Sequence, residues 1–139
     1  MLDLFGFSGF AQDANIQMFV GRVSSTSNTY TYHSWVKPRN ATNIYIVAIG
    51  GGGGGGGGAS SATNANGGGG GGCSGVSCLL ISAYLIADNL YVRAANSGAG
   101  GAAGSNGITG AVSYVNIVAS SVSSPIVLHA SGSVSTIAG

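Results

Sequence analysis

Charged side chains are scarce in this sequence. Lys, Arg, Asp and Glu together make up 5 % of the 139 residues, glutamate does not occur, and the formal net charge is +1. Ordinary globular domains carry roughly 25 % charged residues, and a net charge near zero gives little protection against association. We therefore expect the chain to work inside a larger assembly, as a subunit of a homo-oligomer, rather than as a free monomer.

Basic residues are too few and too dispersed to predict a nucleic-acid site. Binding to phosphate backbones needs clustered Lys and Arg, whereas the four basic residues here are Arg22, Lys37, Arg39 and Arg93. The N-terminal sequence MLDLFGF lacks the cationic segment and unbroken apolar core of a standard secretion signal. No stretch reaches the roughly 18 uninterrupted apolar residues of a transmembrane helix. We expect neither a nucleic acid nor a membrane as partner.

Candidate residues for acid and base chemistry are also few. The carboxylates and histidines of the whole chain are Asp3, Asp13, Asp88, His33 and His129. Any polyglycine run matches the dinucleotide-binding fingerprint trivially, and a P-loop needs Lys and then Ser or Thr directly after its last glycine. Here Ala59 follows one glycine run and Cys73 the other, so neither run is a P-loop. With these few candidate groups, we expect no enzymatic activity, no catalytic residue and no cofactor.

The two cysteines, Cys73 and Cys78, are five positions apart. On one extended strand their Cα atoms would be separated by roughly 16 Å, whereas a disulfide needs less than about 7 Å. Two free thiols are therefore the favoured interpretation, and a disulfide would require a tight turn at Ser74 and Gly75. A metal site is not expected, because neither histidine is near in sequence and four suitable ligands are missing.

Glycine, by contrast, is abundant, with 27 residues that include uninterrupted runs at Gly50–Gly58 and Gly67–Gly72. A third, more dilute stretch extends from Gly98 to Gly110. Ordering glycine costs more backbone entropy than ordering any other residue, so the runs could be flexible tethers. They could also be ordered, if polyproline-II-like strands pack so closely that any Cβ would clash. The sequence leaves both alternatives open.

Short segments with β-type patterns flank the glycine runs. Alternation in YTYHSWV, residues 30–36, predicts a strand with Thr31, His33 and Trp35 on one side. IYIVAI, residues 44–49, is apolar on both faces, which predicts a strand covered on both sides. A further strand at 90–94 should point Leu90 inward and Arg93 outward. The remaining predicted strands are 79–86, 111–119 and 126–130. This pattern predicts an all-β protein, an antiparallel sandwich or a jelly-roll-like domain.

Residues 1–28 are interpreted as a docking arm that precedes a glycine-rich β domain at residues 29–139. All the phenylalanines of the chain lie in this arm, without helical periodicity, at Phe5, Phe7, Phe10 and Phe19. Large aromatic side chains in an irregular terminus need a surface to bury against, either the protein's own core or a neighbouring subunit. The neighbour is favoured, and we expect these phenylalanines together with Trp35 to form an assembly interface.

The order of these segments resembles a known family. Trp35-Val36-Lys37-Pro38, the strand at 44–49 ending in polyglycine, the second glycine run, and then LIADNLYV at 85–92 are similar to the glycine-rich domain of bacteriophage virion proteins, especially tail-fibre and minor structural proteins. The resemblance covers residues 34 to 118. It implies a structural role in the virion, with other capsid or tail proteins as partners and no catalytic residues.

From this resemblance we expect a protein made in the host bacterial cytoplasm and carried on the phage particle. The first expectation is a capsid decoration or cement protein, or a minor surface protein, that docks through the N-terminal arm. The alternative is a receptor-binding tip or tail-fibre component that recognises a host surface ligand. A cellular glycine-rich wall or matrix protein is a third interpretation.

Overall fold

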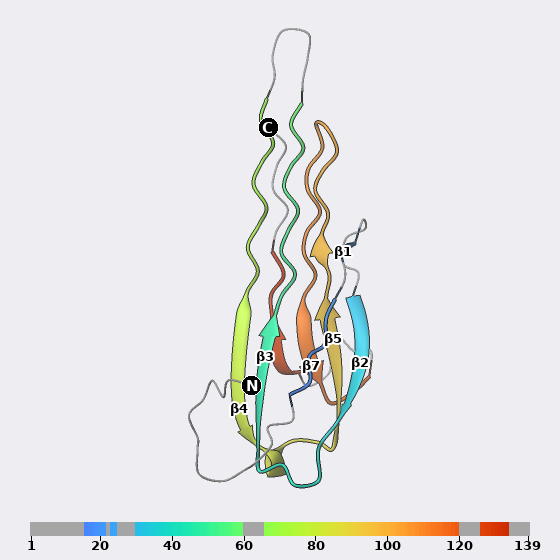
Figure 1. Cartoon of the computed structure of the whole chain (residues 1–139), viewed down its shortest axis with the longest axis vertical. Helices are drawn as coiled ribbons and strands as arrows, with labels where there is room; N and C mark the ends of the chain where they lie inside the picture. Colours follow the sequence, from blue (N-terminus) through green and yellow to red (C-terminus); the bar gives the residue numbers. More distant parts are fainter. Residues whose placement is uncertain (1–15, 22, 25–29, 60–65, 120–125, 134–139) are drawn as a thin grey trace.

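The computed structural model describes residues 16–21, 23–24, 30–59, 66–119 and 126–133. It is a long, narrow molecule with strands gathered at one end and extended chain at the other (Figure 1). In chain order the elements are β1 (Val23–Ser24), β2 (Tyr30–Val36), β3 (Asn43–Ile49), β4 (Val76–Ser82), the 3₁₀ turn η1 (Ala83–Leu85), β5 (Asn89–Ala95), β6 (Ser97–Gly98), β7 (Ser113–Asn116) and β8 (Ile126–Ala130).

The larger sheet has four antiparallel strands in the order β2-β5-β7-β8. Trp35 lies opposite Leu90, and Val92 lies opposite Val115, so these apolar side chains share one face of the sheet. The short strands β1 and β6 pair in parallel beside it. The sheet therefore presents one apolar face for a second layer.

That second layer is the antiparallel hairpin of β3 and β4. Its inward side chains include Ile44, directly opposite Ile81. Between the layers lies a core of Ile86, Leu90 and Val115, against which partly buried residues of both sheets pack, namely Trp35, Ile44, Ile46, Ile81, Val92, Val127 and Leu128. The predicted all-β, sandwich-like fold is confirmed.

Three sequence-based expectations need correction. The predicted strand at 79–86 begins earlier, at Val76, and gives way to η1, where the chain crosses from the hairpin to the larger sheet. The predicted strand at 111–119 shortens to β7, because Ala111 instead hydrogen-bonds with Gly51 and Asn96 and residues 117–119 form a bend and a turn. Arg93 lies on the side of β5 away from Leu90, but it is buried and not exposed to solvent, with its guanidinium 5.0 Å from the centre of the Tyr114 ring. Tyrosines on both neighbouring strands, at Tyr32 and Tyr114, flank Arg93 in the sheet.

The strand at 44–49 is also covered differently from the prediction. Ile44 and Ile46 pack inward, but Tyr45, Val47 and Ile49 on the other face are 59 %, 49 % and 57 % exposed. The hairpin is an outer layer of the sandwich, so only one of its faces meets the core. The expectation of two-sided cover was wrong for the single chain.

Candidate functional site

The glycine runs are ordered and form a stalk that continues from the sandwich (Figure 1). Run Gly50–Gly58 hydrogen-bonds to the rest of the stalk with a period of three residues. On one side, the amides of Gly51, Gly54 and Gly57 donate to the carbonyls of Ala111, Ile108 and Ser105, each at 2.9 Å. This period is that of a polyproline-II-type helix, which has three residues per turn.

The other two faces of the same run are paired as well. The carbonyls of Gly52, Gly55 and Gly58 accept from the amides of Gly98, Gly101 and Gly104 at 2.8, 2.8 and 3.2 Å. Gly53 exchanges two hydrogen bonds with Gly72, and Gly56 accepts one from Gly69. The first glycine run is therefore the central strand of a bundle, with hydrogen-bonded neighbours on three sides.

Close packing explains why the central strand has to be glycine. A Cβ atom added to Gly51, Gly54 or Gly57 would overlap a backbone carbonyl of the segment that carries Asn96, Ala99 and Ala102. On the second run, by contrast, a Cβ at Gly67 or Gly70 would find no atom within 4 Å. The glycine runs are therefore ordered, which decides between the two alternatives left open by the sequence. Glycine is required only at positions that face a neighbouring backbone inside the bundle.

Near the far end of the described stalk, the segment between Gly98 and Gly110 reverses in a tight turn (Figure 1). Ser105 donates its amide to the carbonyl of Ala102 at 2.9 Å, and Gly104 has a φ of 70°. A positive φ at the third position of such a turn is the type II geometry, which favours glycine. Ala102 to Asn106 are all exposed and carry no charge. The turn therefore offers only small side chains and neutral hydrogen-bonding groups to solvent.

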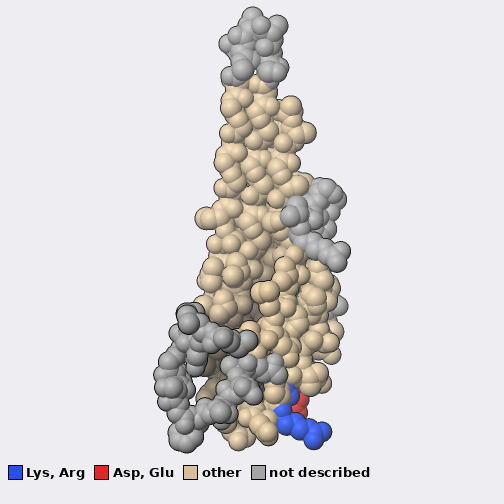
Figure 2. Space-filling model, viewed as in Figure 1, with Lys and Arg blue, Asp and Glu red and all other residues tan. Residues whose placement is uncertain are grey.

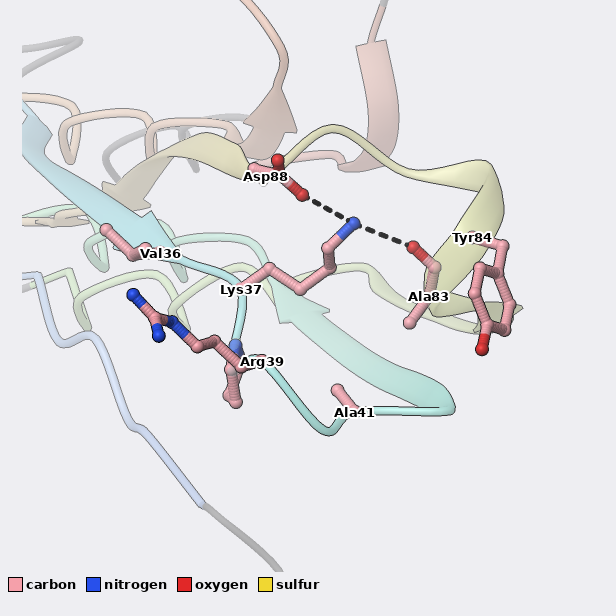
Figure 3. A pocket seen from close by; sticks show the side chains of 8 residues that line it. Val36, Lys37, Arg39, Ala41, Ala83, Tyr84 and Asp88 are labelled. Carbon is pink, nitrogen blue, oxygen red and sulfur yellow. Dashed lines mark hydrogen bonds and ion pairs between the residues drawn. The ribbon is translucent and has the colours of Figure 1, made fainter.

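At the opposite end, a hollow of about 480 Å³ lies between the β2–β3 connection and η1. On the face shown in Figure 2, the visible Lys, Arg and Asp side chains gather at this base. The lining residues are Val36, Lys37, Pro38, Arg39, Ala41, Ala83, Tyr84 and Asp88. Lys37 is the central polar group of the hollow (Figure 3).

The ammonium group of Lys37 holds the base together. It donates to the carbonyls of Ala83 at 2.9 Å and Ile86 at 3.1 Å, and it forms an ion pair with Asp88 at 2.7 Å. The Lys37 side chain is 19 % exposed, whereas that of Asp88 is 83 % exposed. With its donors engaged around the η1 turn, Lys37 acts as a structural clamp.

Replacing Lys37 should therefore cost far more stability than replacing its ionic partner. Lys37→Met keeps the aliphatic stem but leaves two carbonyls without their donor, and we expect a loss of about 2 kcal/mol in the free energy of unfolding. Asp88→Asn alters only an exposed ion pair and should change it by less than about 0.5 kcal/mol. Urea unfolding of both variants tests this contrast. Equal effects would show that the ion pair, and not the carbonyl contacts, secures the turn.

The predicted interface residues are not gathered into one surface among the described residues. Phe5, Phe7 and Phe10 lie outside the described ranges, as do Asp3 and Asp13. Phe19 lies against His33 of β2, with ring centroids 5.1 Å apart. Trp35 packs against the sandwich core. In this chain Trp35 therefore contributes to the fold of the β domain.

The two cysteines are free and exposed, as the thiol interpretation predicted. Cys78 lies on the outward side of β4, and Tyr45 shares that side of the hairpin. The pKa of Tyr45 is raised, first by a side-chain hydrogen bond with Cys78 and second by the charge of that thiol when ionised.

Among the described residues, no group of three or more His, Cys, Asp or Glu could hold a metal ion. No helix in the described part of the chain is long and apolar enough to cross a membrane.

One surface was missed by sequence reasoning, although its signal was present. The outward side of the β3–β4 hairpin is apolar and exposed over three cross-strand pairs. The apolar residues on both faces of the strand at 44–49 were the sequence pattern that indicated it. We name this surface the hairpin face. It consists of Tyr45, Val47, Ile49, Val76, Cys78 and Leu80.

Comparison with known proteins identifies a family for this chain. No curated protein and no solved structure is similar enough to register as a relative. A family model described as "glycine-rich domain" matches residues 25–139, which include all the strands from β2 onward and the whole described stalk. The chain therefore belongs to the glycine-rich domain family.

Proposed function

We propose that this protein is a structural component of a bacteriophage particle, a capsid decoration or minor surface protein attached through its N-terminal arm. Its partners are then other proteins of the virion, and its location is the particle surface. Three features support the proposal: membership of the glycine-rich domain family, a segment order that resembles glycine-rich domains of phage virion proteins, and the scarcity of charge.

The observation that carries the proposal is the three-sided hydrogen bonding of the first glycine run. Nine glycines at the rise of a polyproline-II helix span about 28 Å. Because Gly51, Gly54 and Gly57 tolerate no Cβ, the bundle is thin, and its backbone hydrogen bonds offset the entropy lost on ordering. The result is a narrow, uncharged spacer with a folded base. Such a shape suits display from a surface better than it suits binding or turnover of a small molecule.

A receptor-binding tip or tail-fibre component is the second candidate. The observation that favours it is the turn at 102–105, which lies on the stalk away from the sandwich and exposes Ser105 and Asn106. Neutral hydroxyl, amide and backbone groups can hydrogen-bond a neutral glycan or a peptide. In this case the stalk would serve to hold a recognition surface away from the base.

The number of copies per particle separates the two candidates. A decoration protein covers a repeating lattice, so quantitative mass spectrometry of purified virions should find hundreds of copies. A fibre or tip component should be present in a few tens of copies at most. Absence of the protein from purified particles would exclude both candidates.

The docking role of the arm predicts the result of a truncation. Deleting residues 1–15 removes Phe5, Phe7 and Phe10 but leaves Phe19, which packs on His33. We expect the truncated chain to fold, with an unchanged melting temperature, and to be lost from particles assembled in cells that supply only this version. The full-length chain expressed in the same way is the control. Normal incorporation of the truncated chain would refute attachment through the arm.

A further inference from the structure

The hairpin face has the make-up of a buried layer although it lies at the surface. Its side chains form three directly opposed cross-strand pairs, Tyr45 with Leu80, Val47 with Cys78, and Ile49 with Val76. Leu80 and Val76 are 69 % and 62 % exposed. Strands β3 and β4 contain no charged residue. The surface is therefore continuous, apolar and uncharged.

The opposite face of the same hairpin is apolar too and packs into the sandwich core. An antiparallel sheet with one face in water normally alternates apolar and polar side chains, so that only the core face is apolar. A hairpin that is apolar on both faces is typical of a sheet covered on both sides. The described chain covers only the inner face, so the outer face lacks its cover.

The size of the surface fits a protein interface. With roughly 100 Å² exposed by each large side chain, the hairpin face presents on the order of 500 Å² of apolar area. This is near the upper end of the largest apolar patch on ordinary monomers. A standard interface buries about 800 Å² per partner, which the patch and a narrow rim around it would supply.

The cover has to be as apolar and uncharged as the face itself. Strands β3 and β4 contain no charged residue, so nothing on the face selects a charged partner. On the side shown in Figure 2, the visible charged side chains lie at the base, away from the stalk. A second copy of the chain offers a surface of the right kind, because it presents the same exposed, apolar and uncharged face. Two such layers can pack at the usual sheet spacing of about 10 Å.

We propose that the hairpin face is the homo-oligomer interface of this protein, packed against the hairpin face of a second copy. A two-fold axis through the contact makes the interface self-complementary, which is the commonest arrangement in soluble oligomers. In the resulting pair, four sheet layers form one stack, and both faces of each hairpin are covered. The two-sided apolar sequence of β3 is then explained. Such a pair can form wherever the protein is placed on a particle.

Sedimentation equilibrium of the full chain tests the interface. The wild-type protein should sediment as a dimer at micromolar concentration. Val47→Lys places a charge at the centre of the face, beside its symmetry mate, and should raise the dissociation constant by about 100-fold or more. Val118→Lys is the matched control, since Val118 is 44 % exposed and Val47 is 49 % exposed. The control should remain a dimer, and circular dichroism should show that both variants are folded.

A second measurement uses the unmodified protein. Cys78 lies in the hairpin face, whereas Cys73 precedes β4 and lies outside it. Alkylation of Cys78 should slow as the protein concentration rises through the dimer dissociation constant, while alkylation of Cys73 should not change. If both thiols react at concentration-independent rates, the face is not the interface.

A truncation tests whether the hairpin face is covered by a second copy of the chain or by residues 1–15 of the same chain. Deleting these residues should leave the dimer mass unchanged. If the deletion converts a monomer into a dimer, the arm covers the face within one chain, and the proposal fails. If the deletion abolishes the dimer, the arm of the partner is the contact, and packing of face on face fails. A wild-type protein that stays monomeric at every concentration would also overturn the proposal.

Discussion

Gly54→Ala is expected to lower the free energy of unfolding of the stalk by about 3 kcal/mol. The backbone of Gly54 is in an ordinary region for L-residues, so the effect is purely steric. An added Cβ would overlap the carbonyl of Ala99, which belongs to a backbone that cannot rotate away as a flexible side chain could. Relief would require breaking the hydrogen bond from Gly54 to Ile108. Amide hydrogen exchange of Gly98, Gly101 and Gly104, which donate to the same run, measures the loss.

Gly70→Ala is the matched control, and its effect should have the opposite sign. A Cβ at Gly70 meets no atom within 4 Å, and this glycine also lies outside the left-handed region. Alanine restricts the unfolded chain more than glycine does, so this variant should be more stable by about 0.5 kcal/mol. Equal behaviour of the two variants would contradict the close-packed stalk, because a flexible tether would accept alanine at either position.

Ser113→Ala should cost about 3 kcal/mol, since it removes two hydrogen bonds at the point where the sandwich becomes the stalk. The hydroxyl of Ser113 accepts from the amide of Ala95 at 3.0 Å and donates to the carbonyl of Ile49 at 2.6 Å. One buried side chain thereby connects β7 to β5 and to the last residue of β3. Loss of the hydroxyl leaves both backbone groups without this partner. Thermal and urea unfolding measure the difference.

Ser34→Ala provides the control for this prediction. Ser34 is on β2 and exposed, so its removal should change the free energy of unfolding by no more than about 0.5 kcal/mol. A loss of similar size in both variants would indicate a general effect of serine on strand stability. A negligible loss in Ser113→Ala would show that water replaces the hydroxyl and that the junction is open to solvent.

Local pattern predicted the β elements where alternation was clear. Thr31, His33 and Trp35 lie on the less exposed side of β2, and β8 has the bounds that the sequence indicated after Pro125. The pattern was less informative where burial depends on neighbours. Arg93 reads as an outward residue within its own strand, but tyrosines from two other strands cover it. Alternation reports which side a residue faces, not what lies on that side.

The candidate surfaces were predictable to different degrees. The sequence showed that both faces of the strand at residues 44–49 are apolar. It did not show which of the two faces would remain exposed. The clamp made by Lys37 could not be foreseen, because it joins the β2–β3 connection to a turn more than 40 residues away. The glycine runs indicated either a tether or a bundle. Only hydrogen bonds between distant segments decided between them.

The sequence by itself determined the chemical character of this protein: little charge, two cysteines, short strands and glycine runs with no side chains to pack. The tertiary structure decided that the glycines form a bundle, that one apolar hairpin face remains exposed, and that Arg93 is buried. The physical reason is that polarity and periodicity are local properties of a chain. A glycine has no side chain whose polarity could indicate burial or exposure. The position of a glycine run in the fold is therefore set by hydrogen bonds to segments far away in the sequence.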